Sequence, residues 1–145
     1  RRLKATKCRM FRVKIPEDRE TVNLIGVLYV SGRVIVVDKD NRKMKLFDQS
    51  GKYLSSIDLK DYTWGITYVR DSTFATCGIG DTIYLWTVRG QTIVSEEISY
   101  QVEHGAQGIH FNGMFYCALH QRDYTITILD RQGRKVRKIV MTEAC

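Results

Sequence analysis

The chain has 145 residues, of which 43% are hydrophobic, and its formal net charge at pH 7 is +7. This apolar share excludes a chain that is disordered throughout, and no run approaches the roughly 20 apolar residues of a membrane-spanning helix. The sequence opens with Arg1-Arg2-Leu3-Lys4 rather than with the apolar stretch of a secretory signal. We therefore expect a folded cytoplasmic protein, and the start without methionine suggests a piece of a longer chain.

The N-terminal segment, residues 1–24, holds most of the positive charge, with eight Lys or Arg against three Asp or Glu. Such a surplus suits nucleic acid, an acidic lipid surface or an acidic protein face, and a solvated tail is the plainer explanation. From Lys7 to Ile15, charged and apolar residues alternate except at Phe11, which is the period of a half-buried strand. We predict one strand in this segment.

Residues 25–63 contain four short apolar or alternating stretches. Turn residues separate them, among them Gly32, Asp40-Asn41 and Gly51. The alternation of Lys43, Met44, Lys45 and Leu46 is typical of a strand with one polar and one buried face. The predicted strands are Ile25–Val30, Arg33–Val37, Lys43–Phe47 and Lys52–Leu59.

The same pattern returns twice. In each unit, 25 residues separate the glycine of the first strand from the glycine of the last turn, as between Gly26 and Gly51. The units align without a gap between these glycines when they are shifted by 39 and then by 43 positions. The further strands predicted are Gly65–Val69, Ser72–Cys77, Thr82–Thr87, Thr92–Ile98, Gly108–Phe111, Met114–Leu119, Thr125–Leu129 and Lys135–Val140.

Four strands in each unit of about 40 residues are typical of a β-propeller blade. We therefore predict an all-β fold of about three four-stranded blades, an incomplete or half propeller, with blade 1 over 25–63, blade 2 over 64–105 and blade 3 with the tail over 106–145. The strand predicted in residues 1–24 would belong to a preceding blade or close the ring. Three blades do not close a disc, so we expect either a piece of a larger chain or a homodimer that completes one ring.

A family resemblance is carried by the segment Val34–Leu54, VIVVDKDNRKMKLFDQSGKYL. A β-branched strand ends in Asp38, an Asn-bearing turn follows, and the next strand ends in Phe47-Asp48 before a glycine turn. This order resembles the NHL repeat, and nearly the whole chain resembles the C-terminal propeller of tripartite-motif proteins, especially divergent invertebrate members. The second and third units depart from the repeat, because Cys77 and His120 stand at the Asp38 position.

The resemblance implies a non-catalytic binding module. In that family the propeller recruits protein substrates for an attached RING-type ubiquitin ligase, or binds RNA. RING and B-box zinc motifs do not occur in this sequence, so any ligase activity would reside in other domains, and we expect no enzyme activity from this chain. The expected partner is a protein, with single-stranded RNA as the alternative and a self-assembling scaffold as a third role.

Propeller ligands commonly meet the face formed by the loops between second and third strands and by the loops between blades. In this chain those loops combine basic and aromatic side chains, which suits the stacking and phosphate contacts of single-stranded RNA and also an acidic protein surface. Solvated turns and packing between blades are the plainer explanations. The candidate ligand-binding residues are Lys39, Arg42, Lys43, Tyr62, Trp64, His104, Arg122 and Tyr124.

No metal or cofactor site is predicted. The four cysteines include no Cys-x-x-Cys pair, which leaves a zinc site unsupported. The three histidines are more simply packing or surface residues than an acid–base set: His104, His110 and His120. The possible calcium ligands lie in differing strand and turn contexts, which argues against a convergent cage: Asp38, Asn41, Asp81 and Asp123.

Overall fold

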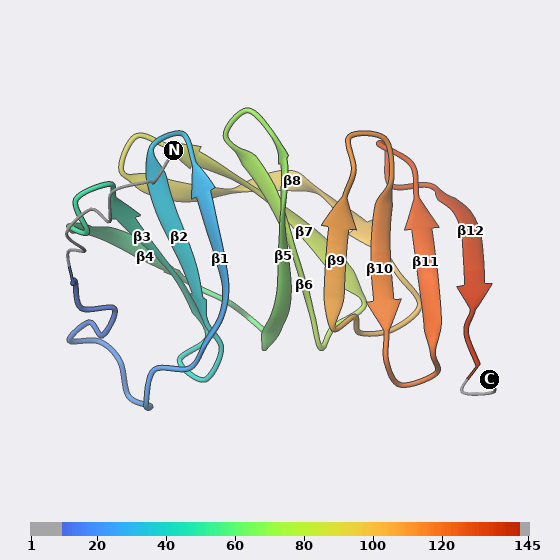
Figure 1. Cartoon of the computed structure of the whole chain (residues 1–145), viewed down its shortest axis with the longest axis horizontal. Helices are drawn as coiled ribbons and strands as arrows, with labels where there is room; N and C mark the ends of the chain where they lie inside the picture. The colour runs from blue at the N-terminus through green and yellow to red at the C-terminus, as the bar shows by residue number, and fades with distance from the viewer. Residues whose placement is uncertain (1–9, 143–145) are drawn as a thin grey trace, which may run out of the picture.

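The computed structural model describes residues 10–142, which form twelve β-strands and no helix (Figure 1). Within this range, no helix is long and apolar enough to cross a membrane. The strands make three antiparallel four-stranded sheets. Blade 1 consists of β1 (Leu24–Val30), β2 (Arg33–Asp38), β3 (Lys43–Asp48) and β4 (Tyr53–Asp58). Blade 2 consists of β5 (Thr63–Arg70), β6 (Thr73–Gly78), β7 (Thr82–Arg89) and β8 (Thr92–Gln101). Blade 3 consists of β9 (Gly108–Phe111), β10 (Tyr116–His120), β11 (Thr125–Leu129) and β12 (Lys135–Val140).

Each blade is a meander in which consecutive strands pair, and the three blades stand side by side (Figure 1). The first strands are neighbours, because β5 contacts both β1 and β9. The all-β prediction and the twelve strands predicted within the repeats are confirmed. The strand β10 begins at Tyr116 rather than at Met114, since the side chain of Asn112 accepts hydrogen bonds from the amides of Met114 (2.9 Å) and Phe115 (2.8 Å) and holds both in a turn.

The apolar core lies between blades. Met44 and Leu46 belong to a buried cluster with Phe74 between blades 1 and 2. Ile83 belongs to a second cluster with Tyr116 between blades 2 and 3. Because each blade buries its apolar side chains against a neighbour, the packed blades rather than single sheets form the stable unit.

The strand predicted over Lys7–Ile15 is not formed where the structure describes it. Met10–Ile15 belong to no sheet, and residues 7–9 lie outside the described residues. Phe11 and Val13 instead contact the face of blade 1 that points away from blade 2. The Phe11 ring lies 5.1 Å from the Phe47 ring, and the Val13 carbonyl accepts a hydrogen bond of 2.8 Å from the Lys45 ammonium. The segment therefore covers a face of a sheet and does not extend an edge.

Candidate functional site

Five loops gather at one end of the molecule, drawn lowest in Figure 1, and we call this the loop end. It comprises residues 39–42, 59–62, 79–81, 102–107 and 121–124. Backbone hydrogen bonds join these loops to one another. The Ile79 amide donates to the Tyr62 carbonyl (3.0 Å), the Val102 amide to the Asp81 carbonyl (2.8 Å), and the Ala106 amide to a carbonyl of β6 (3.0 Å). The loop end is therefore fixed by main-chain contacts as well as by side chains.

Two glycines permit this close approach. A Cβ on Gly78 would lie 2.0 Å from the Tyr62 carbonyl oxygen, and a Cβ on Gly105 would lie 2.6 Å from the Ile79 carbonyl oxygen. Only glycine fits between backbones at these separations. At the opposite end of the molecule, a Cβ added to Gly90 or Gly113 would have no atom within 4 Å. Gly78 and Gly105 at the loop end are therefore crowded by backbone atoms, whereas Gly90 and Gly113 lie in open turns. Other turns at the opposite end are not open, because a Cβ on Gly51 or Gly133 would meet an aromatic side chain.

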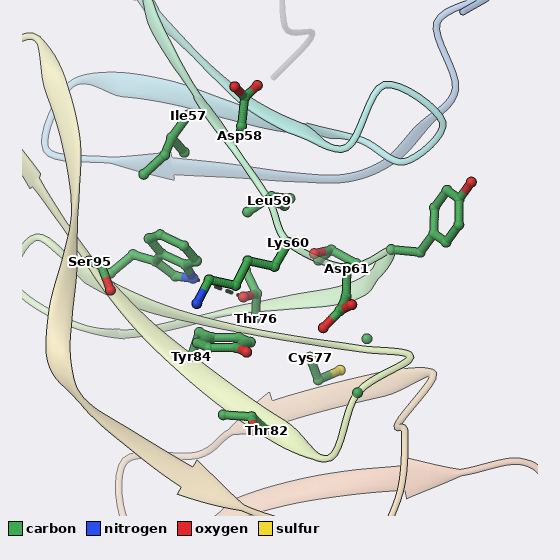
Figure 2. A pocket seen from close by; sticks show the side chains of 15 residues that line it. Ile57, Asp58, Leu59, Lys60, Asp61, Thr76, Cys77, Thr82, Tyr84 and Ser95 are labelled. Carbon is green, nitrogen blue, oxygen red and sulfur yellow. Dashed lines mark hydrogen bonds between the residues drawn. The ribbon is translucent and has the colours of Figure 1, made fainter.

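A pocket of about 260 Å³ opens between blade 1 and blade 2, and we call it the inter-blade pocket (Figure 2). Its apolar walls include Ile57, Leu59, Tyr84 and Trp86. The Trp86 indole N–H donates a hydrogen bond of 2.8 Å to the Thr76 hydroxyl, which fixes the ring. Figure 2 shows the Lys60 side chain extending from the inter-blade linker into this pocket. The remaining lining residues are Asp58, Asp61, Tyr62, Thr63, Cys77, Gly78, Gly80, Thr82 and Ser95.

A second hollow, of about 420 Å³, lies on the other side of the turn 79–81, and we call it the loop-end depression. Gly80 lines both cavities, so they are adjacent. Trp64 reaches the depression from β5, at a β-bulge between Thr63 and Gly65. A bulge redirects a strand side chain. The depression is lined by Trp64, Ile79, Gly80, Asp81, His104, Gly105, Gln107 and Arg122.

Four of the eight predicted site residues line these cavities, and a fifth, Arg42, lines neither but contacts one of the four. Trp64, His104 and Arg122 line the depression, and Tyr62 lines the inter-blade pocket. The Arg42 guanidinium lies 5.1 Å from the centre of the Tyr62 ring, within the range of a cation–π contact.

The other three predicted residues also line neither cavity; Lys39 and Tyr124 lie in loops of the loop end, and Lys43 is the first residue of β3. Lys43 forms an ion pair with Asp58 at 2.5 Å, so its charge is already matched. Lys39 is half-buried in the β2–β3 turn. Tyr124 is 46% exposed and has a positive φ of 57° in the β10–β11 turn.

His104 is held in place by neighbours in blade 3. Its Nε2 lies 2.7 Å from Asp123 Oδ2, and its ring stacks on the His120 ring with 4.5 Å between centroids. A hydrogen bond from Thr125, together with the nearby histidine, holds the pKa of Asp123 below its ordinary value although burial opposes this. His120 is fully buried, and its Nδ1 donates to the Gly105 carbonyl (3.0 Å). We therefore assign His104 and His120 to the support of the loop end.

Except for Tyr62, sequence reasoning missed the residues of the inter-blade pocket. Tyr84 and Trp86 were predicted only as strand residues, because alternation along one strand does not show which neighbouring blade a side chain meets. A polar Thr76 between the apolar Ala75 and Cys77 was the available signal, since a buried hydroxyl needs a partner. Among residues 10–142, no group of three His, Cys, Asp or Glu side chains is arranged to hold a metal ion.

No family model matches this chain, and no curated protein matches it. Solved structures with the same fold include the WD40 domain of Pan2 from Neurospora crassa, with a TM-score of 0.65 and 16% identity over 80% of this chain and 35% of that chain. The RRP9 WD40 repeats give a TM-score of 0.67 and 11% identity over 86% and 40%. Hydrazine synthase from Kuenenia stuttgartiensis gives 0.65 and 12% identity over 89% and 40%.

The fold is therefore that of β-propeller blades, and the chain spans 35–40% of the length of these three chains. The propeller part of the sequence resemblance is confirmed. The neighbours include WD40 domains, and the relation to tripartite-motif proteins stays a prediction. Because one of these structures is named for an enzyme and two for WD40 repeats, the shared fold alone does not assign an activity.

Proposed function

We propose that this chain is a non-catalytic protein-interaction module that binds its partner at the loop end. The observation that carries the proposal is the pair of adjacent cavities on loops that the backbone already fixes. Trp, Tyr and Arg are the residues most enriched among those that dominate binding energy, and Trp64, Tyr62 and Arg122 lie together here. Preformed loops also lower the ordering cost of binding.

The charges favour a protein over RNA as the partner. A single-stranded nucleic acid needs a continuous track of unpaired cations. Here Lys43 is paired with Asp58, while Lys135 and Lys138 are both paired with Glu103 at 2.9 Å. Acidic residues also interrupt the loops, at Asp40, Asp61 and Asp81. The resemblance to NHL propellers adds a role for such a module, the recruitment of a substrate to a ubiquitin ligase.

We infer that a ring completed by two copies is disfavoured. Such a ring requires the face of blade 1 that points away from blade 2. Phe11 and Val13 occupy that face, and Ile15 is only 4% exposed. A second copy would have to displace this segment before the ring closed.

The test is selection of a phage-displayed random 12-residue peptide library on the purified chain, followed by fluorescence anisotropy with the selected peptides. We expect R42E and R122E to weaken binding at least about tenfold, since each inverts a charge at the loop end. R89E makes the same charge change at an exposed position on the opposite end and is the matched control. Binding that R42E and R122E leave unchanged would contradict the proposal.

A parallel titration with a 20-residue oligouridine tests the alternative. If RNA is the ligand, its affinity falls log-linearly with salt, with a slope set by the number of phosphate contacts. We expect no such binding at 150 mM salt. Tight, salt-dependent binding that R122E abolishes and R89E spares would replace the protein proposal with the RNA one.

A further inference from the structure

The geometry points to a bipartite peptide site at the loop end: an extended segment that places one apolar side chain in the inter-blade pocket and one carboxylate side chain in the loop-end depression. This inference rests on the proposed function and specifies the chemistry of the partner. It follows from the lining of the two cavities, from the donors that face the depression, and from the short turn that separates them.

The inter-blade pocket is suited to one apolar side chain. Its volume of about 260 Å³ exceeds that of a single leucine or phenylalanine side chain, and most of its exposed lining is apolar. The long side chain of Lys60 also extends into it, so an entering group has to displace the Lys60 ammonium toward solvent. Three of its polar groups are already engaged, because Trp86 donates to Thr76 and the Thr82 hydroxyl donates to Asp81. An incoming apolar group would therefore leave these hydrogen bonds intact while it displaces water from Tyr84 and Leu59.

The loop-end depression is rich in hydrogen-bond donors. Among residues 10–142, no acceptor bonds the guanidinium of Arg122 or the indole N–H of Trp64. Gln107 uses its Oε1 to accept from the Gln121 amide at 2.6 Å, which leaves its two amide hydrogens for another acceptor. A carboxylate supplies two acceptor oxygens and a charge that Arg122 matches, and charge-assisted hydrogen bonds of this kind are the strongest available.

The nearby acidic groups do not fill this role. Asp123 is engaged by His104 and by Thr125, each through a different oxygen. Asp81, which also lines the depression, accepts from the Thr82 hydroxyl at 3.1 Å. The donors of Arg122 and Trp64 thus remain for a ligand.

The distance between the cavities fits a short extended segment. Both flank the three-residue turn 79–81 and share Gly80. An extended peptide rises about 3.3 Å per residue, so two to four residues cover roughly 7–13 Å, a span that suits two cavities with a common lining residue. We therefore expect the acidic and apolar side chains about two to four residues apart in the partner.

The test uses the peptides selected on the purified chain and rests on their consensus. We expect an Asp or Glu two to four residues from a Leu, Phe, Ile or Met. Replacing the peptide's carboxylate by its amide, or its apolar residue by alanine, should each weaken binding at least about tenfold. These changes are made in the peptide, so they place no demand on the folding of the chain.

Two variants assign each half of the peptide to its cavity. R122Q should lower the affinity for the acidic peptide about tenfold and leave the affinity for its amide analogue unchanged. Both changes remove the same contact, that between Arg122 and the peptide carboxylate, so the second change has no further effect. S95F places a ring at the inter-blade pocket and should weaken the parent peptide but not its alanine analogue. R89Q and an unchanged thermal midpoint serve as controls.

The outcomes separate this inference from the function on which it rests. Selected peptides without an acidic residue, or equal losses for the acidic and amide peptides in R122Q, overturn the bipartite site while leaving loop-end binding intact. If R42E, R122E and S95F all leave the affinity of the selected peptides unchanged, both the bipartite site and the proposed function are overturned.

Discussion

Lys45 and Asp38 form an ion pair from which solvent is completely excluded, with 2.9 Å between Nζ and Oδ2 and no exposed surface on either side chain. Lys45 also contacts Asp18 Oδ2 at 2.6 Å and the Val13 carbonyl at 2.8 Å. One lysine of β3 thus joins the end of β2 to the N-terminal segment. A lysine at full burial is stable only with such partners, since a lone buried charge is very costly.

Without the Lys45 ammonium, the protein should unfold far more readily. We expect K45M to lower the free energy of unfolding by about 3–5 kcal/mol, because Asp18 and Asp38 are left as unmatched buried carboxylates. K43M is the matched control on the same strand, and its ion pair with the 82% exposed Asp58 should contribute at most about 1 kcal/mol. Urea titration followed by tryptophan fluorescence measures both, and equal small losses would contradict the assigned role of Lys45.

Acid should weaken the protein through Asp38. Burial alone would raise the pKa of this carboxyl, but hydrogen bonds from the Asn23 amide, Lys45 and Asn41 outweigh it and hold the pKa below the ordinary 3.8. Because the folded-state pKa is lower than the unfolded one, the stabilisation is present above about pH 4 and is lost as the pH falls through the folded pKa. We expect the difference in urea midpoint between wild type and D38N to shrink from pH 7 to pH 3. A constant difference would exclude Asp38 from the acid response.

Cys77 should resist alkylation in the native protein. Burial raises the pKa of this thiol to about 12, so almost no thiolate is present at neutral pH, and the Sγ–H donates to the Ala106 carbonyl at 3.3 Å. Iodoacetamide labelling with peptide mass analysis should show Cys77 unmodified until urea is added. Native labelling at the rate of the unfolded chain would mean that the loop end opens frequently.

The close backbone approach at Gly78 gives a further test. G78A places a methyl group 2.0 Å from the Tyr62 carbonyl oxygen, so the loops must move, and we expect a loss of about 1–3 kcal/mol. G108A is the control, because its methyl group would meet only Leu119 Cβ at 3.8 Å. Urea titration compares the free energies of unfolding of the two variants. Equal values would show that the loops can move apart without a loss of stability.

The twelve strands of the repeats could be predicted because their turns carry a local signature. Gly51, Gly90 and Gly133 recur at one position of the three units, and each has a positive φ between 59° and 88°, which favours glycine. Such a signal depends on the residue itself and not on distant contacts. It therefore survives in the sequence even where the blades differ in composition.

Contacts between segments distant in the sequence could not be predicted from the sequence pattern. Lys45 stands at a polar position of an alternating strand, yet it is fully buried because the N-terminal segment folds over that face. Met10–Ile15 alternates like a strand but finds no sheet edge with which to pair. The loops of the candidate site could be predicted from the order of the strands. The pocket around Trp86 could not, because it depends on how two blades pack together.

The open turns at Gly90 and Gly113, opposite the loop end, are suited to the attachment of labels. Neither turn has an atom within 4 Å of a built Cβ, whereas Gly78 and Gly105 at the loop end have backbone atoms within 3 Å. A fluorophore, an affinity tag or an inserted domain joined at these turns would leave the loop end accessible. Immobilisation through the same turns would present every copy to an analyte in one orientation, as surface-based kinetic measurements require.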